Sequence, residues 1–264
     1  MDLGLEGKTA LVTGGSKGIG RAVARTLAAE GAHVAICSRD EAALKDAAAE
    51  IERATGRREE VVRGDLSRRE EVSRVPAASL ARLGRLDILV NNAGAIKGGD
   101  FLTTPDEEWL NGWSLKLLGY IRLAREVLPH MQTQGGGRIV NVVGAAARNP
   151  AATYMMGGTA NAALINFTKA LSDLGARSNV LVTGVSPGPV KTERWDSLMA
   201  QQAKAAGQDL ESYVKERSQE LPLGRIALPE EVADVVCFLA SQRASFLTGI
   251  TITIDGGITR GVYL

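Results

Sequence analysis

A run of glycines near the N-terminus is the segment of this sequence best suited to bind a ligand. It reads TGGSKGIG over residues 13–20, after a β-branched run and directly before a helical pattern. Glycines let a strand turn sharply into a helix, so that a diphosphate can reach backbone N–H groups at the positive end of the helix. A purely structural turn would leave this order unexplained. The pattern predicts a dinucleotide site, with these cofactor contacts: Gly14, Ser16, Lys17, Gly18, Ile19 and Gly20.

The type of dinucleotide is indicated about 20 residues beyond the glycines. A protein that binds NAD usually presents an acidic residue there to the ribose 2′-hydroxyl, but Ser38 occupies this point and Arg39 follows it. A guanidinium can form two charge-assisted hydrogen bonds with a 2′-phosphate, and Lys17 could add a second positive charge. We therefore predict NADP(H). Asp40 keeps NAD(H) open, because it could turn to the ribose or instead cap the next helix.

The elements that position these residues follow from the alternation of two patterns. Short β-branched runs alternate with longer segments that carry apolar residues at three- and four-residue spacing. Several of the short runs are almost wholly apolar, as expected for strands covered on both faces. We predict strands at 9–13, 33–38, 60–63, 86–91, 138–143, 180–186 and 251–254, and helices at 18–30, 41–55, 70–83, 105–133, 158–176 and 229–241. The predicted fold is α/β: a single-domain Rossmann fold, with a doubly wound seven-stranded parallel sheet and helices on both faces.

Composition narrows the classes of function further. The chain has 264 residues, no evident linker and a formal net charge of +1, so we expect one domain over 1–264 and no nucleic-acid or membrane partner. No leader pattern or long apolar stretch is present, which predicts a cytoplasmic protein. Cys37 and Cys237 lack metal-ligand spacing, so we expect buried thiols and no metal site. A polar helical segment at about 192–222 is either a substrate lid or an ordinary exposed helix pair.

The whole arrangement resembles the short-chain dehydrogenase/reductase family, and the resemblance covers almost the entire chain. The matching segments are 13–20, GDL at 64–66, NNAG at 91–94 and SPGPVKT at 186–192. The resemblance implies that Asp65 and Leu66 flank the adenine. It also implies that the centre and the nicotinamide end of the cofactor are held by Asn92, Ala93, Gly94, Pro187, Gly188 and Thr192. Members of the family commonly form tetramers, so it further implies a homotetramer or a dimer.

The catalytic positions depart from the family. Its members use an asparagine, a serine, a tyrosine as proton donor and a lysine four residues after the tyrosine. In register with the flanking motifs, these positions hold Lys116, Gly144, Gly157 and Asn161. A missing general acid removes about 10² to 10⁴ in rate, so the usual mechanism is not expected here.

Three hypotheses follow for the activity. In the first, the chain is an NADP(H)-dependent oxidoreductase acting on a carbonyl or alcohol, with Lys116 restoring the lost ammonium, Tyr154 supplying a phenol and Asn161 orienting a substrate oxygen. In the second, it binds NADP(H) without catalysis. In the third, it performs a non-redox reaction in the same pocket. A solvated Lys116 and a packing Tyr154 are the structural alternatives to their catalytic roles. The substrate would be a small molecule in the first and third hypotheses.

Overall fold

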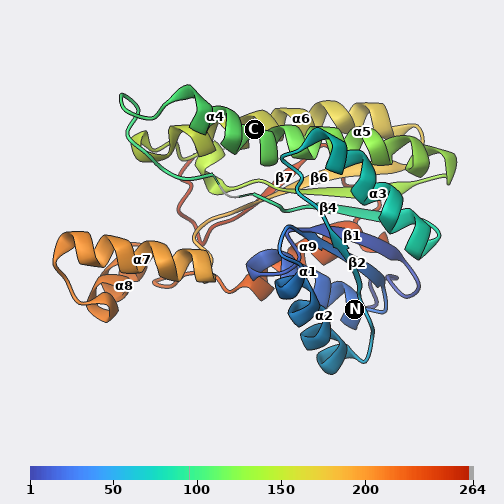
Figure 1. Cartoon of the computed structure of the whole chain (residues 1–264), viewed down its shortest axis with the longest axis horizontal. Helices are drawn as coiled ribbons and strands as arrows, with labels where there is room; N and C mark the ends of the chain where they lie inside the picture. Colours follow the sequence, from blue (N-terminus) through green and yellow to red (C-terminus); the bar gives the residue numbers. More distant parts are fainter. Residues whose placement is uncertain (95, 262–264) are drawn as a thin grey trace.

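Seven parallel strands form one sheet at the centre of the protein. The computed structural model describes residues 1–94 and 96–261, and Figure 1 shows the sheet between two layers of helices. Its order is β3-β2-β1-β4-β5-β6-β7, so the strand order reverses between β1 and β4. The strands are β1 (Thr9–Thr13), β2 (His33–Ser38), β3 (Glu60–Arg63), β4 (Ile88–Asn91), β5 (Gly137–Val142), β6 (Val180–Pro187) and β7 (Thr251–Ile254). The predicted single α/β domain with a seven-stranded parallel sheet is confirmed.

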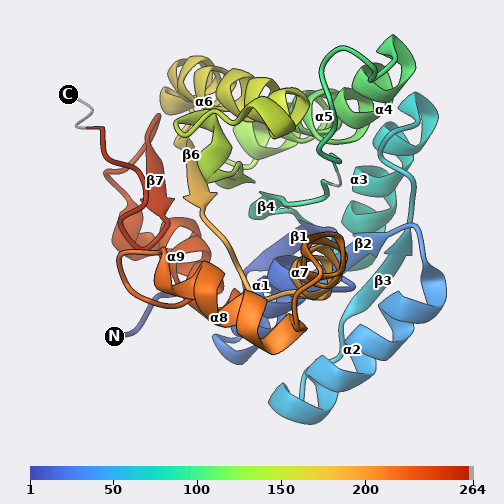
Figure 2. The same cartoon turned by 90° about the vertical axis from the view of Figure 1, so that its left-hand side faces the viewer.

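Each face of the sheet is covered by helices that bury one apolar stripe. One layer holds α1 (Gly18–Ala29), α2 (Glu41–Thr55) and α9 (Pro229–Ala240); the other holds α3 (Arg69–Leu83), α5 (Leu117–Thr133) and α6 (Met155–Ala176). Figure 2 shows the two layers on opposite sides of the strands. The nearly continuous apolar strands β1, β4 and β5 are buried along their whole length, as sheets covered on both faces require. Cys37 and Cys237 are buried free thiols.

The helix predicted at 105–133 is wrong as a single element. The structure has two helices, α4 (Asp106–Leu115) and α5, with Lys116 between them. The hydrogen bonds on either side of the break are long, 3.3 Å from Lys116 N to Gly112 O and 3.4 Å from Tyr120 N to Lys116 O. The break coincides with a long-range contact, because the Lys116 amine donates to the carbonyl of Val143.

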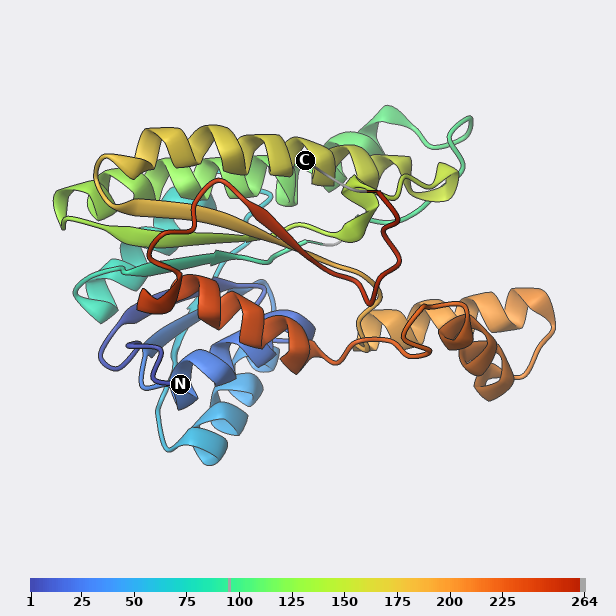
Figure 3. The same ribbon diagram turned by 180° about the vertical axis from the view of Figure 1, so that it is seen from behind.

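Two further helices, α7 (Glu193–Ala206) and α8 (Leu210–Gln219), occupy most of the segment predicted as a lid or exposed helix pair. They form a hairpin that projects beyond the body of the domain, as Figures 1 and 3 show from opposite sides. Only the beginning of α7 therefore lies beside the carboxyl ends of the strands. Whether the hairpin acts as a lid stays a prediction.

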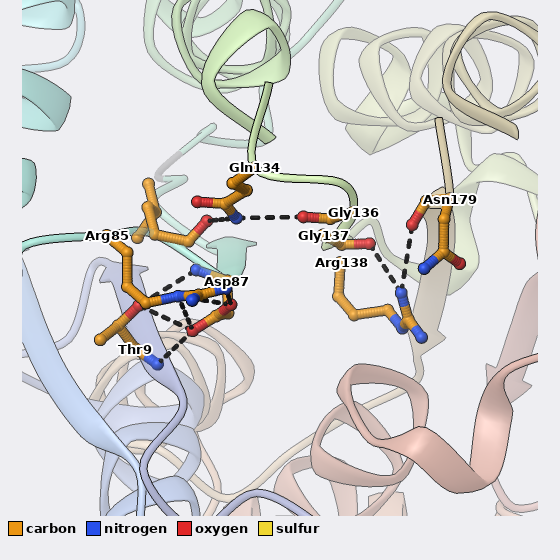
Figure 4. Close-up of polar contacts among 9 residues, drawn as sticks. Thr9, Arg85, Asp87, Gln134, Gly136, Gly137, Arg138 and Asn179 are labelled. Carbon is orange, nitrogen blue, oxygen red and sulfur yellow. Dashed lines mark hydrogen bonds and ion pairs between the residues drawn. The ribbon is translucent and has the colours of Figure 1, made fainter. Parts of the chain in front are cut away.

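The edge of the sheet opposite the glycine turn is held by a polar network (Figure 4). The buried Asp87 carboxylate accepts hydrogen bonds from Thr9 N and Thr9 Oγ1, both at 3.0 Å, and forms an ion pair with Arg85 at 2.6 Å. Arg138 Nη1 donates to the carbonyls of Gly137 and Asn179. These contacts tie the starts of neighbouring strands together. Within the described residues, no helix is both long and apolar enough to cross a membrane.

Candidate active site

The glycine turn after β1 leaves the first amides of α1 available to an anion. Gly14 and Gly18 have φ values of +67° and +53°, which favour glycine. A Cβ at Gly20 would lie 2.2 Å from the carbonyl oxygen of Gly14, so only glycine allows α1 to start this close to the turn. Lys17 is the N-cap residue of α1, and its side chain forms no hydrogen bond with the amides of the first turn. The first turn of the helix contains no acidic residue. A diphosphate therefore meets N–H donors and no competing carboxylate on α1.

The loop after β4 is fixed to this turn at the point where the strand order reverses. Thr13 Oγ1 accepts hydrogen bonds from Asn92 N at 2.9 Å and Ala93 N at 3.1 Å, while Asn92 Nδ2 donates to the Thr13 carbonyl at 3.0 Å. Asn92 thus braces the two loops against each other. The predicted cofactor residues of both loops lie side by side, in the crevice where doubly wound folds bind their ligands.

At the end of β2, the acidic residue that kept NAD(H) open is engaged elsewhere. The Asp40 carboxylate accepts a hydrogen bond from Ala43 N at 3.1 Å and caps α2, while Arg39 is exposed. Lys17 forms an ion pair with Glu193 of α7 at 2.8 Å. This pair links the glycine turn to the beginning of the hairpin. In the loop after β3, Asp65 accepts from Ser67 Oγ at 2.7 Å and Leu66 is buried.

A cleft of about 620 Å³ runs from the glycine turn across the carboxyl ends of β1, β4, β5 and β6. Its walls are the loops that follow these strands and the first turns of α7. Most predicted cofactor residues lie along it, namely Gly14, Lys17, Gly18, Ile19, Asn92, Ala93, Gly94, Pro187, Gly188 and Thr192. Lys116 and Gly144 lie in the same cleft.

Lys116 reaches the cleft from the break between α4 and α5. Its stem passes Gly94, where a Cβ would lie 3.0 Å from Lys116 Cδ, and its Nζ donates to the carbonyl of Val143 at 2.5 Å. The residue as a whole is half-buried and lines the cleft. Burial, together with the nearby positive charge of Arg194, lowers the pKa of Lys116 to about 7.

Asn161 fills the room beside Gly144. It is 2% exposed, and a Cβ at Gly144 would lie 2.9 Å from Asn161 Nδ2. Gly144 also has a φ of +143°. Asn161 Oδ1 is buried and has no hydrogen-bond partner among the described residues. Positions 144 and 161 are therefore coupled, because the Asn161 amide occupies space that a side chain at 144 would need.

Tyr154 is placed differently. Its ring covers Gly157, where a Cβ would lie 2.1 Å from Tyr154 Cζ and 2.5 Å from its hydroxyl oxygen. The ring packs in an apolar cluster with Trp109 and Trp113 and lines a separate small hollow rather than the cleft. The structure thus brings Lys116 and Gly144 to the cleft, sets Asn161 behind Gly144 and leaves Tyr154 beside it.

Arg194 and Trp195 are among the cleft residues that were not predicted as parts of the site. Arg194 lines the cleft and its Nη2 donates to the carbonyl of Ile96; Trp195 lines the cleft next to it. The available signal was their position directly after Thr192, which was itself predicted as a cofactor residue.

The fold and the site define a Rossmann-type α/β protein with a dinucleotide cleft at the switch point of its sheet. The family model described as enoyl-(acyl carrier protein) reductase matches residues 14–259. The chain belongs to the short-chain dehydrogenase/reductase family and, with it, to the oxidoreductases of that type.

Individual relatives match over nearly their whole length. The 2,3-dihydro-2,3-dihydroxybenzoate dehydrogenase of Bacillus subtilis (strain 168) is 34% identical over 259 residues, covering 98% of either chain. The structure of L-sorbose reductase from Gluconobacter frateurii, complexed with NADPH and L-sorbose, has a TM-score of 0.95 at 34% identity, covering 99% of this chain and 100% of the other. A variant of actinorhodin polyketide ketoreductase with NADPH has a TM-score of 0.92 at 31% identity, covering 96% and 98%.

Proposed function

We propose that this protein is an NADP(H)-dependent oxidoreductase that interconverts a carbonyl and an alcohol, with Lys116 as the proton-transferring residue. The observation that carries the proposal is the Lys116 amine, enclosed in the cleft beside Gly94 and Gly144 with its pKa lowered to about 7. A group with a pKa near the working pH is an effective general acid and base. The two solved relatives described above were both crystallised with NADPH.

The residues present fit a phosphorylated dinucleotide. Any Cβ at Gly20 would collide with the Gly14 carbonyl and close the glycine turn. The first turn of α1 offers amides and contains no acidic residue. Since Asp40 caps α2, it does not face the ribose as a competing acid, which favours a 2′-phosphate beside Arg39 over a 2′-hydroxyl. Gly14–Gly20 would hold the pyrophosphate, and Pro187, Gly188 and Thr192 the nicotinamide end.

The proton step follows from the position of Lys116. When bound, the reduced nicotinamide supplies a hydride to the carbonyl carbon. The carbonyl oxygen then gains the electron pair of its π bond, and the Lys116 ammonium donates a proton to it. Neutral Lys116 is held by the Val143 carbonyl and regains its proton from water in the cleft. In the oxidative direction, neutral Lys116 accepts the proton of the alcohol.

The other two candidates have different roles in this proposal. Asn161 lies behind Gly144, and its buried Oδ1 has no partner among the described residues, so it can orient a water or a substrate hydroxyl at the glycine. Tyr154 has a packing role in this proposal, because its ring covers Gly157 and lines the separate hollow outside the cleft. Its predicted role as a phenol donor is therefore less well supported than that of Lys116.

The proposal is tested by following NADPH oxidation over a panel of ketones and aldehydes. Lys116→Met should lower kcat about 10²- to 10⁴-fold, while Tyr154→Phe should change it less than about tenfold. The binding of NADPH, measured by calorimetry, should persist in both variants.

Other outcomes would contradict the proposal. If Tyr154→Phe were the damaging change, the proton donor would be the phenol. Tight NADPH binding with no turnover of any compound would instead favour a cofactor-binding protein without catalysis, and product formation without net NADPH consumption would favour a non-redox reaction.

A separate prediction concerns the choice of cofactor. Replacing Arg39 with Ala should weaken NADPH binding by about tenfold or more, because a charge-assisted pair with the 2′-phosphate is lost. NADH binding should stay almost unchanged, since it carries no 2′-phosphate. Arg53→Ala, at the far end of α2, is the matched control for the removal of a positive charge. Equal loss of affinity for both cofactors would contradict the assignment of Arg39.

Assembly and location belong to the same proposal. We expect a cytoplasmic homotetramer or dimer, as the family resemblance implies. Exposed apolar side chains support the assembly: Leu118 on α5, Leu174 on α6 and Phe246 before β7 are 38%, 62% and 101% exposed. A second copy of the chain would cover such surfaces.

A further inference from the structure

The end of the cleft beside Lys116 has an excess of positive charge. Arg194, in the first turn of α7, lines this end and is anchored by its hydrogen bond to the Ile96 carbonyl. Among the described residues, neither Arg194 nor Lys116 forms an ion pair with a carboxylate. Glu193 is the one acidic side chain among the described residues of the lining, and Lys17 engages it at 2.8 Å. Two cations thus share one end of the cleft without a counter-ion.

Such an arrangement is costly for the free protein and is relieved by an anion. Like charges at close range disfavour each other's charged state, and Arg194 is indeed the second cause, after burial, of the lowered pKa of Lys116. The neighbouring Trp195 adds a neutral donor, because its Nε1 is buried and lacks a hydrogen-bond partner among the described residues. An unpaired buried N–H carries a free-energy cost that a ligand oxygen can remove.

We propose that the substrate carries a carboxylate a few bonds from its reacting carbonyl carbon, and that Arg194 binds this carboxylate. The inference rests on the proposed function, since Lys116 then marks the reacting carbon. A guanidinium can hold a carboxylate through two parallel hydrogen bonds, and one donation to Ile96 leaves Arg194 other N–H groups for this purpose. The substrate class is therefore the small oxo acids and the corresponding hydroxy acids.

The phosphates of the cofactor are the other possible anion, and the geometry disfavours them. The pyrophosphate has its own donors at the first turn of α1, where Lys17 and Glu193 form their pair. Arg194 is bound instead to Ile96, two residues beyond Gly94. Gly94 in turn lies against the stem of Lys116. Arg194 thus belongs to the Lys116 end of the cleft.

The experiment uses pairs of compounds that differ only in the negative charge. Pyruvate, acetoacetate and levulinate, which place the carboxylate progressively farther from the ketone, are each compared with their methyl esters as oxidants of NADPH. For the best pair, the wild-type protein should prefer the acid in kcat/KM by about tenfold to hundredfold, the value of a charge-assisted hydrogen bond. The spacing of that pair measures the distance from Arg194 to the reacting carbon.

Variants at Arg194 assign the preference to its guanidinium. At a pH well below the Lys116 inflection, Arg194→Gln should abolish the preference, so that the ratio of kcat/KM for the acid to kcat/KM for the ester falls to about one, and Arg194→Lys should retain part of it. Lys204→Gln removes an exposed charge farther along α7 and should leave kcat/KM unchanged for both the acid and the ester. The Kd of NADPH should be the same in all variants. A raised Kd in Arg194→Gln with no change in acid preference would show that the guanidinium serves the cofactor and would overturn the inference.

The inference and the proposed function fail in different ways. Turnover of esters as fast as acids by the wild-type protein would overturn the inference while leaving the oxidoreductase intact. If no compound were turned over, the proposed function would fail, and calorimetric titration of the NADP⁺-loaded protein with the same acids and esters would then decide. Binding of an acid that is lost in Arg194→Gln would support an acid-binding site; equal binding of acid and ester, or binding of neither, would overturn it.

Discussion

The pKa of Lys116 sets a pH dependence that should differ in sign between the two directions of the reaction. Reduction requires the protonated amine, so kcat/KM should be flat below pH 7 and fall roughly tenfold per unit above it. Oxidation requires the neutral amine, so its kcat/KM should fall on the acidic side of the same pKa of about 7. The charged side chains that share the cleft with Lys116 are Arg194, Glu193 and Lys17. The Glu193 carboxylate is paired with Lys17.

Two variants isolate this titration. Lys116→Met should retain at most a small residual activity without the inflection near pH 7. Arg194→Gln removes the positive neighbour, so the inflection should move to higher pH, because one cause of the lowered pKa is lost. Profiles measured in both directions check the sign. An inflection that persists in Lys116→Met would assign it to another group.

At the scale of elements, the strands could be predicted from the sequence because their patterns are local. The bounds of β1, β2, β3 and β7 agree with the predicted ranges at both ends, and each of these strands is followed directly by a glycine or a charged residue. The glycine turn was equally predictable, because a strand, a turn and a helix follow one another within a short segment. Most of the predicted cofactor residues consequently line the cleft.

Features that depend on long-range contacts were not predictable in the same way. The apolar periodicity of 105–133 continues through Lys116, whereas the break there accompanies a hydrogen bond to Val143, 27 residues away in the sequence. Gly157 and Gly158 have low helix propensity, yet α6 begins before them at Met155. At Gly158 a Cβ would lie 3.3 Å from the carbonyl of Ala146, so this part of the helix lies close to another backbone segment. Arg194 was not predicted as a site residue, because the hydrogen bond that holds it joins α7 to the loop after β4.

For the whole molecule, the two edges of the sheet have separate roles. The carboxyl ends of the strands carry the cleft, with glycines, a poorly solvated lysine and unpaired polar atoms that cost stability. The opposite edge carries the Asp87 network, in which the carboxylate is paired with Thr9 and Arg85 (Figure 4). A single strand, β4, connects Asp87 at one end with the Asn92–Gly94 loop at the other. Stability and activity should therefore respond to different substitutions along this strand.

Asp87→Asn tests this division of roles. The amide cannot pair with Arg85 as an ion, and one of the two oxygens that accept from Thr9 and Arg85 becomes a donor. The variant should lose about 1–3 kcal/mol of stability, which corresponds to a fall in Tm of roughly 2–4 °C for each kcal/mol. The Arg85 side chain is 53% exposed, so Arg85→Gln should cost at most about 1 kcal/mol of stability.

Thermal unfolding, NADPH affinity and kcat are measured on the same samples. Because the cleft lies at the other edge, the affinity and kcat of Asp87→Asn should equal those of the wild type at temperatures well below its Tm. Lys116→Met should behave in the opposite way, with kcat lost and Tm kept or raised, since it removes a buried charge. A large loss of NADPH affinity in Asp87→Asn would mean that β4 transmits the state of one edge to the other.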